Sequence, residues 1–150
     1  MSVKILIVDD HEVVRQGVRS IISKMRPQWE VCGEASNGEE AIQAAEDLSP
    51  DIVLLDITMP VMNGFNAAPR IAKLGHPILI FTMHESETLE TDVRRSGASG
   101  YVLKSQAVRD LILAIERVLA GGTFFGPENQ VPENRKKPEP WNILTRRPLL

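Results

Sequence analysis

Four short polar stretches, each placed directly after an apolar run, contain the residue types that phosphoryl transfer needs. They are Asp9-Asp10, Asp56, Thr82 and Lys104. Three carboxylates at one place repel each other and resist full ionisation, and a hard divalent cation such as Mg²⁺ relieves that repulsion. A lysine supplies a point positive charge for phosphate oxygens, and a threonine supplies a hydroxyl donor. The set predicts a phosphoryl-transfer site in which Asp56 is the nucleophile that forms an aspartyl-phosphate.

These side chains can meet only if the apolar runs before them are neighbouring parallel strands. The four runs cover residues 5–8, 52–55, 78–81 and 101–103. None alternates cleanly between apolar and polar residues, which is typical of strands buried on both faces. A fifth run, residues 29–35, does alternate, and this favours an edge strand with one wetter face.

Helical patterns fill the intervals between the runs and complete the fold prediction. Apolar stripes at three- and four-residue steps predict helices over residues 14–25, 41–48 and 111–119, and weaker patterns predict helices over 64–74 and 85–96. Alternating strands and helices imply a parallel sheet covered on both faces. We therefore predict an α/β, flavodoxin-like (βα)5 doubly wound parallel sheet with strand order 2-1-3-4-5. That order puts the alternating run at an edge and the polar residues in one crevice.

Composition and charge narrow the class of protein. The chain has 150 residues, a length that favours one domain, and a net charge of −3. Residues 1–126 hold 12 basic and 17 acidic residues, and this acidic balance argues against a broad phosphate-backbone contact with nucleic acid. The single cysteine, Cys32, excludes an intramolecular disulfide and is typical of a cytoplasmic protein. No apolar run is long enough to span a membrane.

The C-terminal part differs in composition from the rest. Residues 127–150 contain five of the ten prolines and no glycine, and they carry five basic and three acidic residues. Such a segment is typical of a linker. The sequence therefore predicts a folded domain over residues 1–126 and a proline-rich linker that begins at residue 127.

The sequence around the polar residues resembles the receiver domain of bacterial two-component response regulators. The matching stretches are Ile-Val-Asp-Asp-His at 7–11, Leu-Asp-Ile-Thr-Met-Pro-Val-Met-Asn-Gly at 55–64, Phe-Thr-Met-His at 81–84 and Gly-Tyr-Val-Leu-Lys-Ser at 100–105. Details within and around them resemble the LuxR-type (NarL/FixJ) branch. The resemblance covers residues 1–126 and implies a two-component signalling function.

The resemblance implies a role for each acidic residue. Asp56 would accept a phosphoryl group from the phosphohistidine of a sensor histidine kinase. Asp10, Asp56 and the backbone carbonyl of Thr58 would coordinate Mg²⁺, with Asp9 holding the ion directly or through water. His11 and His84 flank this group, and we interpret them as solvated loop histidines, because an oxygen-rich site prefers Mg²⁺.

The resemblance also implies a switch. Lys104 would pair with the bound phosphoryl group, Thr82 would reorient toward it, and Tyr101 would turn inward when Thr82 moves. Such a device is a two-state element biased by a local change of charge. The surface that reports the change would be formed by the fourth helix, fifth strand and fifth helix, and the first helix resembles a kinase-docking helix.

The last residues of the sequence bear on whether this chain can bind DNA. LuxR-type regulators carry a DNA-binding helix-turn-helix after such a linker, and residues 141–147 resemble only the first residues of that domain. No recognition helix follows within this sequence, so we expect no DNA binding by this chain alone. We interpret residues 127–150 as a linker and the truncated start of an output domain. The resemblance further implies a homodimer.

Four alternatives remain beside the front of a transcriptional regulator. The chain could be a stand-alone receiver, or a pseudo-receiver that acts by protein contact alone. A phosphatase with an aspartate nucleophile would want a second acid two positions after Asp56, where this chain has Thr58. A flavodoxin-like FMN binder is disfavoured because Asp9-Asp10 would repel the FMN phosphate. We expect no metabolic enzyme activity, only Mg²⁺-dependent self-phosphorylation from small phosphodonors and self-dephosphorylation.

Overall fold

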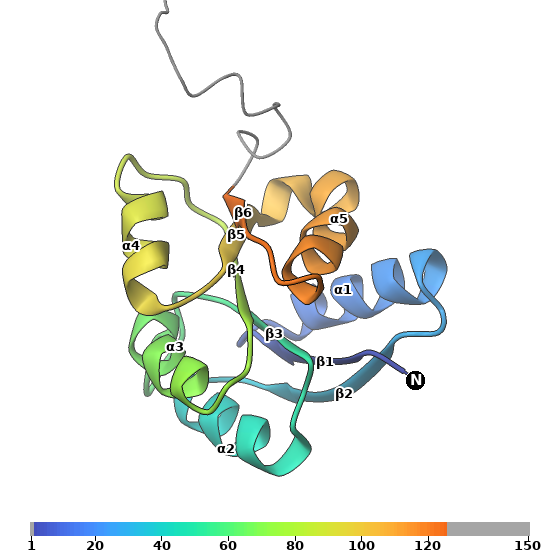
Figure 1. Ribbon diagram of the computed structural model, residues 1–150, viewed down its shortest axis with the longest axis horizontal. Helices are drawn as coiled ribbons and strands as arrows, with labels where there is room; N and C mark the ends of the chain where they lie inside the picture. The colour runs from blue at the N-terminus through green and yellow to red at the C-terminus, as the bar shows by residue number, and fades with distance from the viewer. Residues whose placement is uncertain (1, 126–150) are drawn as a thin grey trace, which may run out of the picture.

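A computed structural model describes residues 2–125, which form one parallel sheet with helices on both faces (Figure 1). The sheet has six strands in the order β2-β1-β3-β4-β5-β6. The strands are β1 (Lys4–Val8), β2 (Glu30–Ala35), β3 (Ile52–Leu55), β4 (Ile78–Thr82), β5 (Gly100–Leu103) and β6 (Phe124–Phe125). The helices are α1 (Glu12–Met25), α2 (Gly38–Leu48), α3 (Gly64–Lys73), α4 (Leu89–Ser96) and α5 (Ala107–Leu119), with a short 3₁₀ turn η1 (Lys104–Gln106). The predicted flavodoxin-like fold and its order 2-1-3-4-5 are confirmed.

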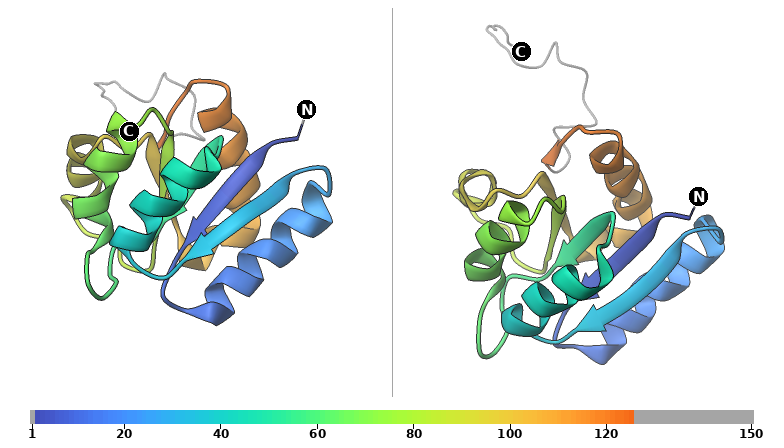
Figure 2. Two further views of the ribbon diagram at one scale, coloured as in Figure 1. Left: turned by 90° about the horizontal axis from the view of Figure 1, so that it is seen from below. Right: turned by 60° about the horizontal axis from the view of Figure 1, so that its bottom comes forward.

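The apolar runs form the middle of the sheet because helices cover them on both sides. Along β1, Ile5 and Ile7 pack toward α1 and α5, whereas Leu6 and Val8 pack toward α2, α3 and α4. The two helical layers lie on opposite faces in Figure 2. All four residues of β3 are buried, as a strand covered on both faces requires. Apolar packing therefore fixes the register of β1 against β3, and with it the relative positions of the residues that follow them.

The edge strand β2 fits its predicted position but not a clean alternation. It pairs with β1 alone among the described strands. Its two glutamates, Glu30 and Glu34, are exposed, yet Val31, Cys32 and Gly33 are all half-buried. The register shifts by one residue between Ile5 and Leu6 of β1, so the simple two-residue period is interrupted.

The sixth strand was not predicted. β6 is two residues long and pairs in parallel with β5, with Gly100 opposite Phe124 and Tyr101 opposite Phe125. A run of two residues is too short to show a periodic pattern. Space for β6 exists because residue 100 is glycine: a Cβ there would lie 1.9 Å from the carbonyl oxygen of Phe124.

Caps set where two of the helices begin. The side chain of Asn37 accepts a hydrogen bond from the Glu40 amide at the start of α2, and Asn63 does the same for Asn66 at the start of α3. α4 begins at Leu89, four residues later than the weak pattern over 85–96 predicted. Residues 127–150, with the predicted linker and output-domain start, lie outside the described residues. Within residues 2–125, no helix is both long and apolar enough to cross a membrane.

Candidate functional site

The ends of β1, β3, β4 and β5 bring the predicted site residues together. A cavity of about 360 Å³ opens at this end of the sheet. Its lining consists of polar residues from the four strand ends with one apolar side chain, namely Asp10, His11, Asp56, Thr58, Thr82, Met83, His84 and Lys104. Parallel strands present their carboxyl ends at one edge, which is why residues up to 94 positions apart in the sequence meet here.

Lys104 connects two buried carboxylates beneath this cavity. Its Nζ lies 2.7 Å from Asp9 Oδ2 and 3.4 Å from Asp56 Oδ1. Asp9 is 1% exposed and Asp56 is 4% exposed, so both carboxylates are almost completely removed from solvent. The Ile57 amide donates a hydrogen bond of 2.8 Å to Asp56 Oδ1. The lysine therefore holds the two carboxylates in place from one side.

The electrostatic environment disfavours the charged form of Asp56. Burial raises the pKa of this carboxyl above its usual range, and the nearby charge of Asp9 raises it further. Lys104 and the Ile57 amide act in the opposite direction without cancelling the effect. A cation near Asp56 would thus meet a carboxylate whose negative charge is incompletely compensated.

His11 is closer to the acidic residues than the sequence indicated. Its side chain is exposed, as expected for a loop histidine, but Nδ1 lies 3.1 Å from Asp9 Oδ1 and 3.2 Å from Asp10 Oδ1. The His11 amide also donates to Asp9 Oδ1 at 2.9 Å. The turn after β1 therefore folds the histidine back onto the two carboxylates, a contact that adjacency in the sequence did not reveal.

The donor set fits a divalent cation. One ligand atom from each of Asp9, Asp10, His11 and Asp56 can be chosen so that all lie within 4.8 Å of one another. Oxygens on opposite sides of one Mg²⁺ are about 4 Å apart, so a small adjustment would let the carboxylates share an ion. Three carboxylates face a single lysine, which leaves an excess of negative charge for the ion to balance. Thr58 is exposed and lines the same cavity.

Thr82 and Tyr101 lie on one face of adjacent strands. Thr82 is buried at the end of β4, and its Oγ1 accepts a 3.4 Å hydrogen bond from the His84 amide. In β5, Tyr101 lies opposite Ile80, two residues before Thr82, so both side chains point to the α4 side of the sheet. Tyr101 is 5% exposed, and its ring contacts that of Phe125. The two predicted switch residues therefore lie on the same face of adjacent strands.

Two residues outside the predicted set also position the carboxylates. Gly64 donates its amide to the Ile57 carbonyl at 2.7 Å, and a Cβ at Gly64 would lie 2.1 Å from the Asp56 carbonyl oxygen. The sequence indicated Gly64 only as the first residue of the helix predicted over residues 64–74. Arg15, from α1, donates from Nη1 to the Asp9 carbonyl at 2.6 Å. No local sequence signal links Arg15 to β1.

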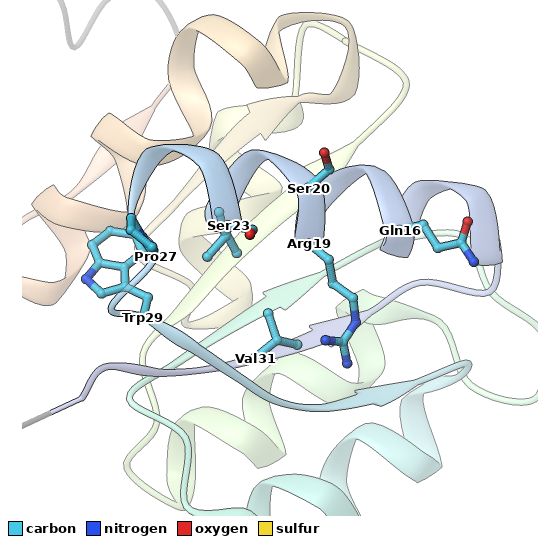
Figure 3. Close-up of a pocket in the computed structure, with 8 residues that line it drawn as sticks. Gln16, Arg19, Ser20, Ser23, Pro27, Trp29 and Val31 are labelled. Carbon is cyan, nitrogen blue, oxygen red and sulfur yellow. The ribbon is translucent and has the colours of Figure 1, made fainter.

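A second cavity, of about 470 Å³, lies between α1 and β2 (Figure 3), and none of Asp9, Asp10, Asp56 and Lys104 lines it. Its lining is mixed and consists of Gln16, Arg19, Ser20, Ile22, Ser23, Pro27, Trp29 and Val31. Arg19 is the charged group among them, and its guanidinium already pairs with Glu34. This cavity lacks the carboxylates and the lysine that phosphoryl chemistry would use.

Comparison with known proteins agrees with the geometry. A family model described as the response regulator receiver domain matches residues 5–116. The chain is 36% identical over 141 residues to the transcriptional regulatory protein DegU of Brevibacillus brevis, covering 90% of this chain and 59% of DegU. It is 41% identical over 119 residues to the nitrate/nitrite response regulator protein NarL of Escherichia coli K12, covering 78% of this chain and 55% of NarL. The chain thus spans little more than half the length of these curated relatives.

Solved structures show the same fold. A two-component response regulator of the LuxR family from Aurantimonas sp. SI85-9A1 superposes with a TM-score of 0.79 at 37% identity, covering 91% of this chain and 100% of that one. The receiver domain of RcsB from Salmonella enterica serovar Typhimurium, solved in the presence of the phosphomimetic BeF3⁻, gives a TM-score of 0.75 at 25% identity. It covers 85% of this chain and 95% of that one.

Proposed function

The chain belongs to the response regulator receiver domain family, and on that premise we propose that Asp56 accepts a phosphoryl group from a sensor histidine kinase. Among the family's branches it is of the LuxR/NarL type. The observation that carries the proposal is the position of Asp56, buried at the base of a polar cavity and 3.4 Å from the Nζ of Lys104. A nucleophile, a positive charge and a space for a phosphoryl group are thus next to one another.

The transfer exchanges one bond to phosphorus for another. An Asp56 carboxylate oxygen forms a bond to the phosphorus while the bond from phosphorus to the donor nitrogen breaks, and the electron pair leaves with the kinase imidazole. With acetyl phosphate as donor, the electron pair leaves with acetate. Later a water attacks the phosphorus, and the bond to the Asp56 oxygen breaks to release inorganic phosphate. This weak self-catalysis is the extent of the enzymatic activity that we propose.

The remaining site residues bind and orient the phosphoryl group. Lys104 can exchange its 2.7 Å contact with Asp9 for a contact with a phosphoryl oxygen. Asp9, Asp10, Asp56 and the Thr58 backbone carbonyl would hold Mg²⁺. Bound Mg²⁺ would supply the positive charge that the transferring phosphoryl oxygens require. The three carboxylates of this set belong to a group whose ligand atoms all lie within 4.8 Å of one another, and this closeness supports the assignment.

The signal would leave the site through Thr82 and Tyr101. Attraction of the Thr82 hydroxyl toward the phosphoryl group would open space into which the Tyr101 ring can turn, altering the surface formed by α4, β5 and α5. One relative is named a transcriptional regulatory protein and another a nitrate/nitrite response regulator protein. These names support a role for this chain as part of a LuxR-type transcriptional regulator. We propose that the protein lies in the cytoplasm and forms a homodimer.

Intact-mass measurement after incubation with acetyl phosphate tests the acceptor. The wild-type chain is expected to gain the mass of one phosphoryl group, only when Mg²⁺ is present. Asp56→Asn is expected to gain none, whereas Asp47→Asn, a matched change on the exposed face of α2, is expected to behave as wild type. An adduct that persists in Asp56→Asn, or no adduct in the wild type, contradicts the proposal. The second result would favour a pseudo-receiver.

A further inference from the structure

The two phenylalanines of β6 connect both helical layers to the strand that carries Tyr101. Phe124 is fully buried with α1 and α5 on one face of the sheet, and Phe125 is buried with α3 and α4 on the other. The Arg117 guanidinium of α5 lies 5.7 Å from the Phe124 ring centroid. A two-residue strand therefore contacts α4, β5 and α5, the elements of the proposed output surface.

Phe125 lies between Tyr101 and a cation. Its ring meets that of Tyr101 in an edge-to-face arrangement, with centroids 6.3 Å apart and planes at 70°. The Arg94 guanidinium of α4 lies 3.8 Å from the Phe125 centroid, and Arg94 is oriented by a 2.9 Å ion pair with Glu90. Edge-to-face and cation–π contacts both depend on ring position. The position of Phe125 therefore depends on where the Tyr101 ring lies.

Backbone contacts hold β6 closely against β5 in this structure. The Phe124 amide donates to the Ser99 carbonyl at 3.0 Å, and the Phe124 carbonyl occupies the space that a side chain at Gly100 would take. Tyr101 lies opposite Phe125 in this register. A shift of the Tyr101 ring toward Thr82 thus removes the aromatic partner that faces the last residue of β6.

We propose that β6 is a latch: docked, it holds the Tyr101 ring in its edge-to-face contact with Phe125, and movement of Tyr101 toward Thr82 undocks it. This inference rests on the proposed function, because the phosphoryl group on Asp56 would drive the movement of Tyr101. Coupling between two such events is reciprocal, so phosphorylation weakens β6 docking and loss of β6 docking favours phosphorylation. The chain from residue 126 onward continues directly from Phe125, so its anchor point would change with the state of Asp56.

A pair of matched substitutions tests the direction of the coupling. Phe125→Leu keeps an apolar side chain but removes the ring beside Tyr101, and Phe124→Leu makes the same change on the opposite face of the same strand. The half-saturating concentration of beryllofluoride, with Mg²⁺ present, is expected to fall about fivefold in Phe125→Leu. In Phe124→Leu it is expected to stay within about twofold of wild type. An unchanged Phe125→Leu, or an equal fall in both variants, overturns the latch.

Amide hydrogen exchange at Phe124 and Phe125 tests the coupling without and with a phosphoryl mimic. Tyr101→Leu alone is expected to raise the exchange rate about fivefold or more, whereas Tyr101→Phe, which keeps the ring, is expected to leave it unchanged. In the wild-type chain, beryllofluoride with Mg²⁺ is expected to raise it similarly. If the wild-type chain binds beryllofluoride through Asp56 but the amides of Phe124 and Phe125 do not exchange faster, the latch is contradicted and the proposed function still stands. Wild type that does not bind it contradicts the proposed function, and the Tyr101→Leu result then decides the latch.

Discussion

Two regions of the same sheet accommodate charged side chains in opposite ways. The acidic end consists of Asp9, Asp10, Asp56 and Lys104, and the aromatic edge consists of Tyr101, β6 and the arginines that stack on it, Arg94 and Arg117. At the acidic end, the carboxylates of Asp9 and Asp56 are buried with Lys104 between them, and Asp10 is exposed. At the aromatic edge, the guanidinium groups lie over buried rings.

The two regions differ in whether their charged side chains are balanced by partners within the domain. Each stacked arginine at the aromatic edge meets a ring within its own domain, and Arg94 also pairs with Glu90. The acidic end holds more negative than positive charge, and burial together with the nearby charge of Asp9 raises the pKa of Asp56. A protein keeps such an unfavourable arrangement where a ligand relieves it. Added charge at the acidic end can therefore change the free energy of the domain, and we propose that the aromatic edge reports that change.

Removing one cation from each region is expected to give the largest difference in the free energy of unfolding. Lys104→Met leaves Asp9 and Asp56 buried without their shared partner, and it is expected to lower the free energy of unfolding by about 3 kcal/mol. Arg94→Met removes a partly exposed cation–π contact and is expected to cost about 0.5–1 kcal/mol. Urea denaturation at neutral pH without Mg²⁺ measures both values. Equal losses in the two variants would remove the distinction between the regions.

The two regions also differ in how far the sequence predicts them. The acidic end was predictable because each of its residues directly follows a buried run, so the order of the strands alone gathers them. The fold was predictable for the same reason: four runs without alternation indicated strands covered on both faces.

The aromatic edge was not predictable because its contacts are not periodic. Phe124-Phe125 is two residues long, and its docking depends on the absence of a side chain at Gly100, which lies 24 positions earlier. The same limit applies at the acidic end, where Arg15 and Gly64 support the carboxylates through backbone contacts made across the fold. Contacts of this kind become visible only when tertiary packing is known.

A methyl group at Gly100 tests how strictly the aromatic edge is packed. Gly100→Ala places a Cβ 1.9 Å from the Phe124 carbonyl oxygen, so β6 must move, and the expected loss of stability is about 1–3 kcal/mol. Gly17→Ala is the matched control, because no atom lies within 4 Å of its added Cβ in α1. This control is expected to gain about 0.5–1 kcal/mol from the better helix propensity of alanine. Thermal unfolding of both variants gives the comparison, and a Gly100→Ala variant as stable as wild type would show that β6 is loosely held.

The smallest expected effect comes from neutralising the acidic end, and its pH dependence identifies the cause. Because burial and Asp9 raise the pKa of Asp56 in the folded state, its contribution to stability is present below the unfolded-state pKa of about 4. That contribution is lost as the pH rises through the folded-state value. Asp56→Asn removes this loss, so the variant is expected to be more stable than wild type by about 1 kcal/mol at pH 7 and nearly equal to it near pH 4.

Mg²⁺ is expected to reduce this stability difference between Asp56→Asn and wild type. It binds the carboxylates of the folded wild-type protein and stabilises the folded state by mass action. Thermal unfolding of Asp56→Asn and wild type at both pH values, with and without Mg²⁺, measures all four differences. Asp51→Asn, which removes an exposed carboxylate bonded to the Lys4 amide, serves as the control and is expected to show no Mg²⁺-dependent difference from wild type. If Asp56→Asn is less stable than wild type at pH 7 without Mg²⁺, the carboxylates of the acidic end stabilise the fold by themselves. The contrast with the aromatic edge would then have to be explained by packing rather than by uncompensated charge.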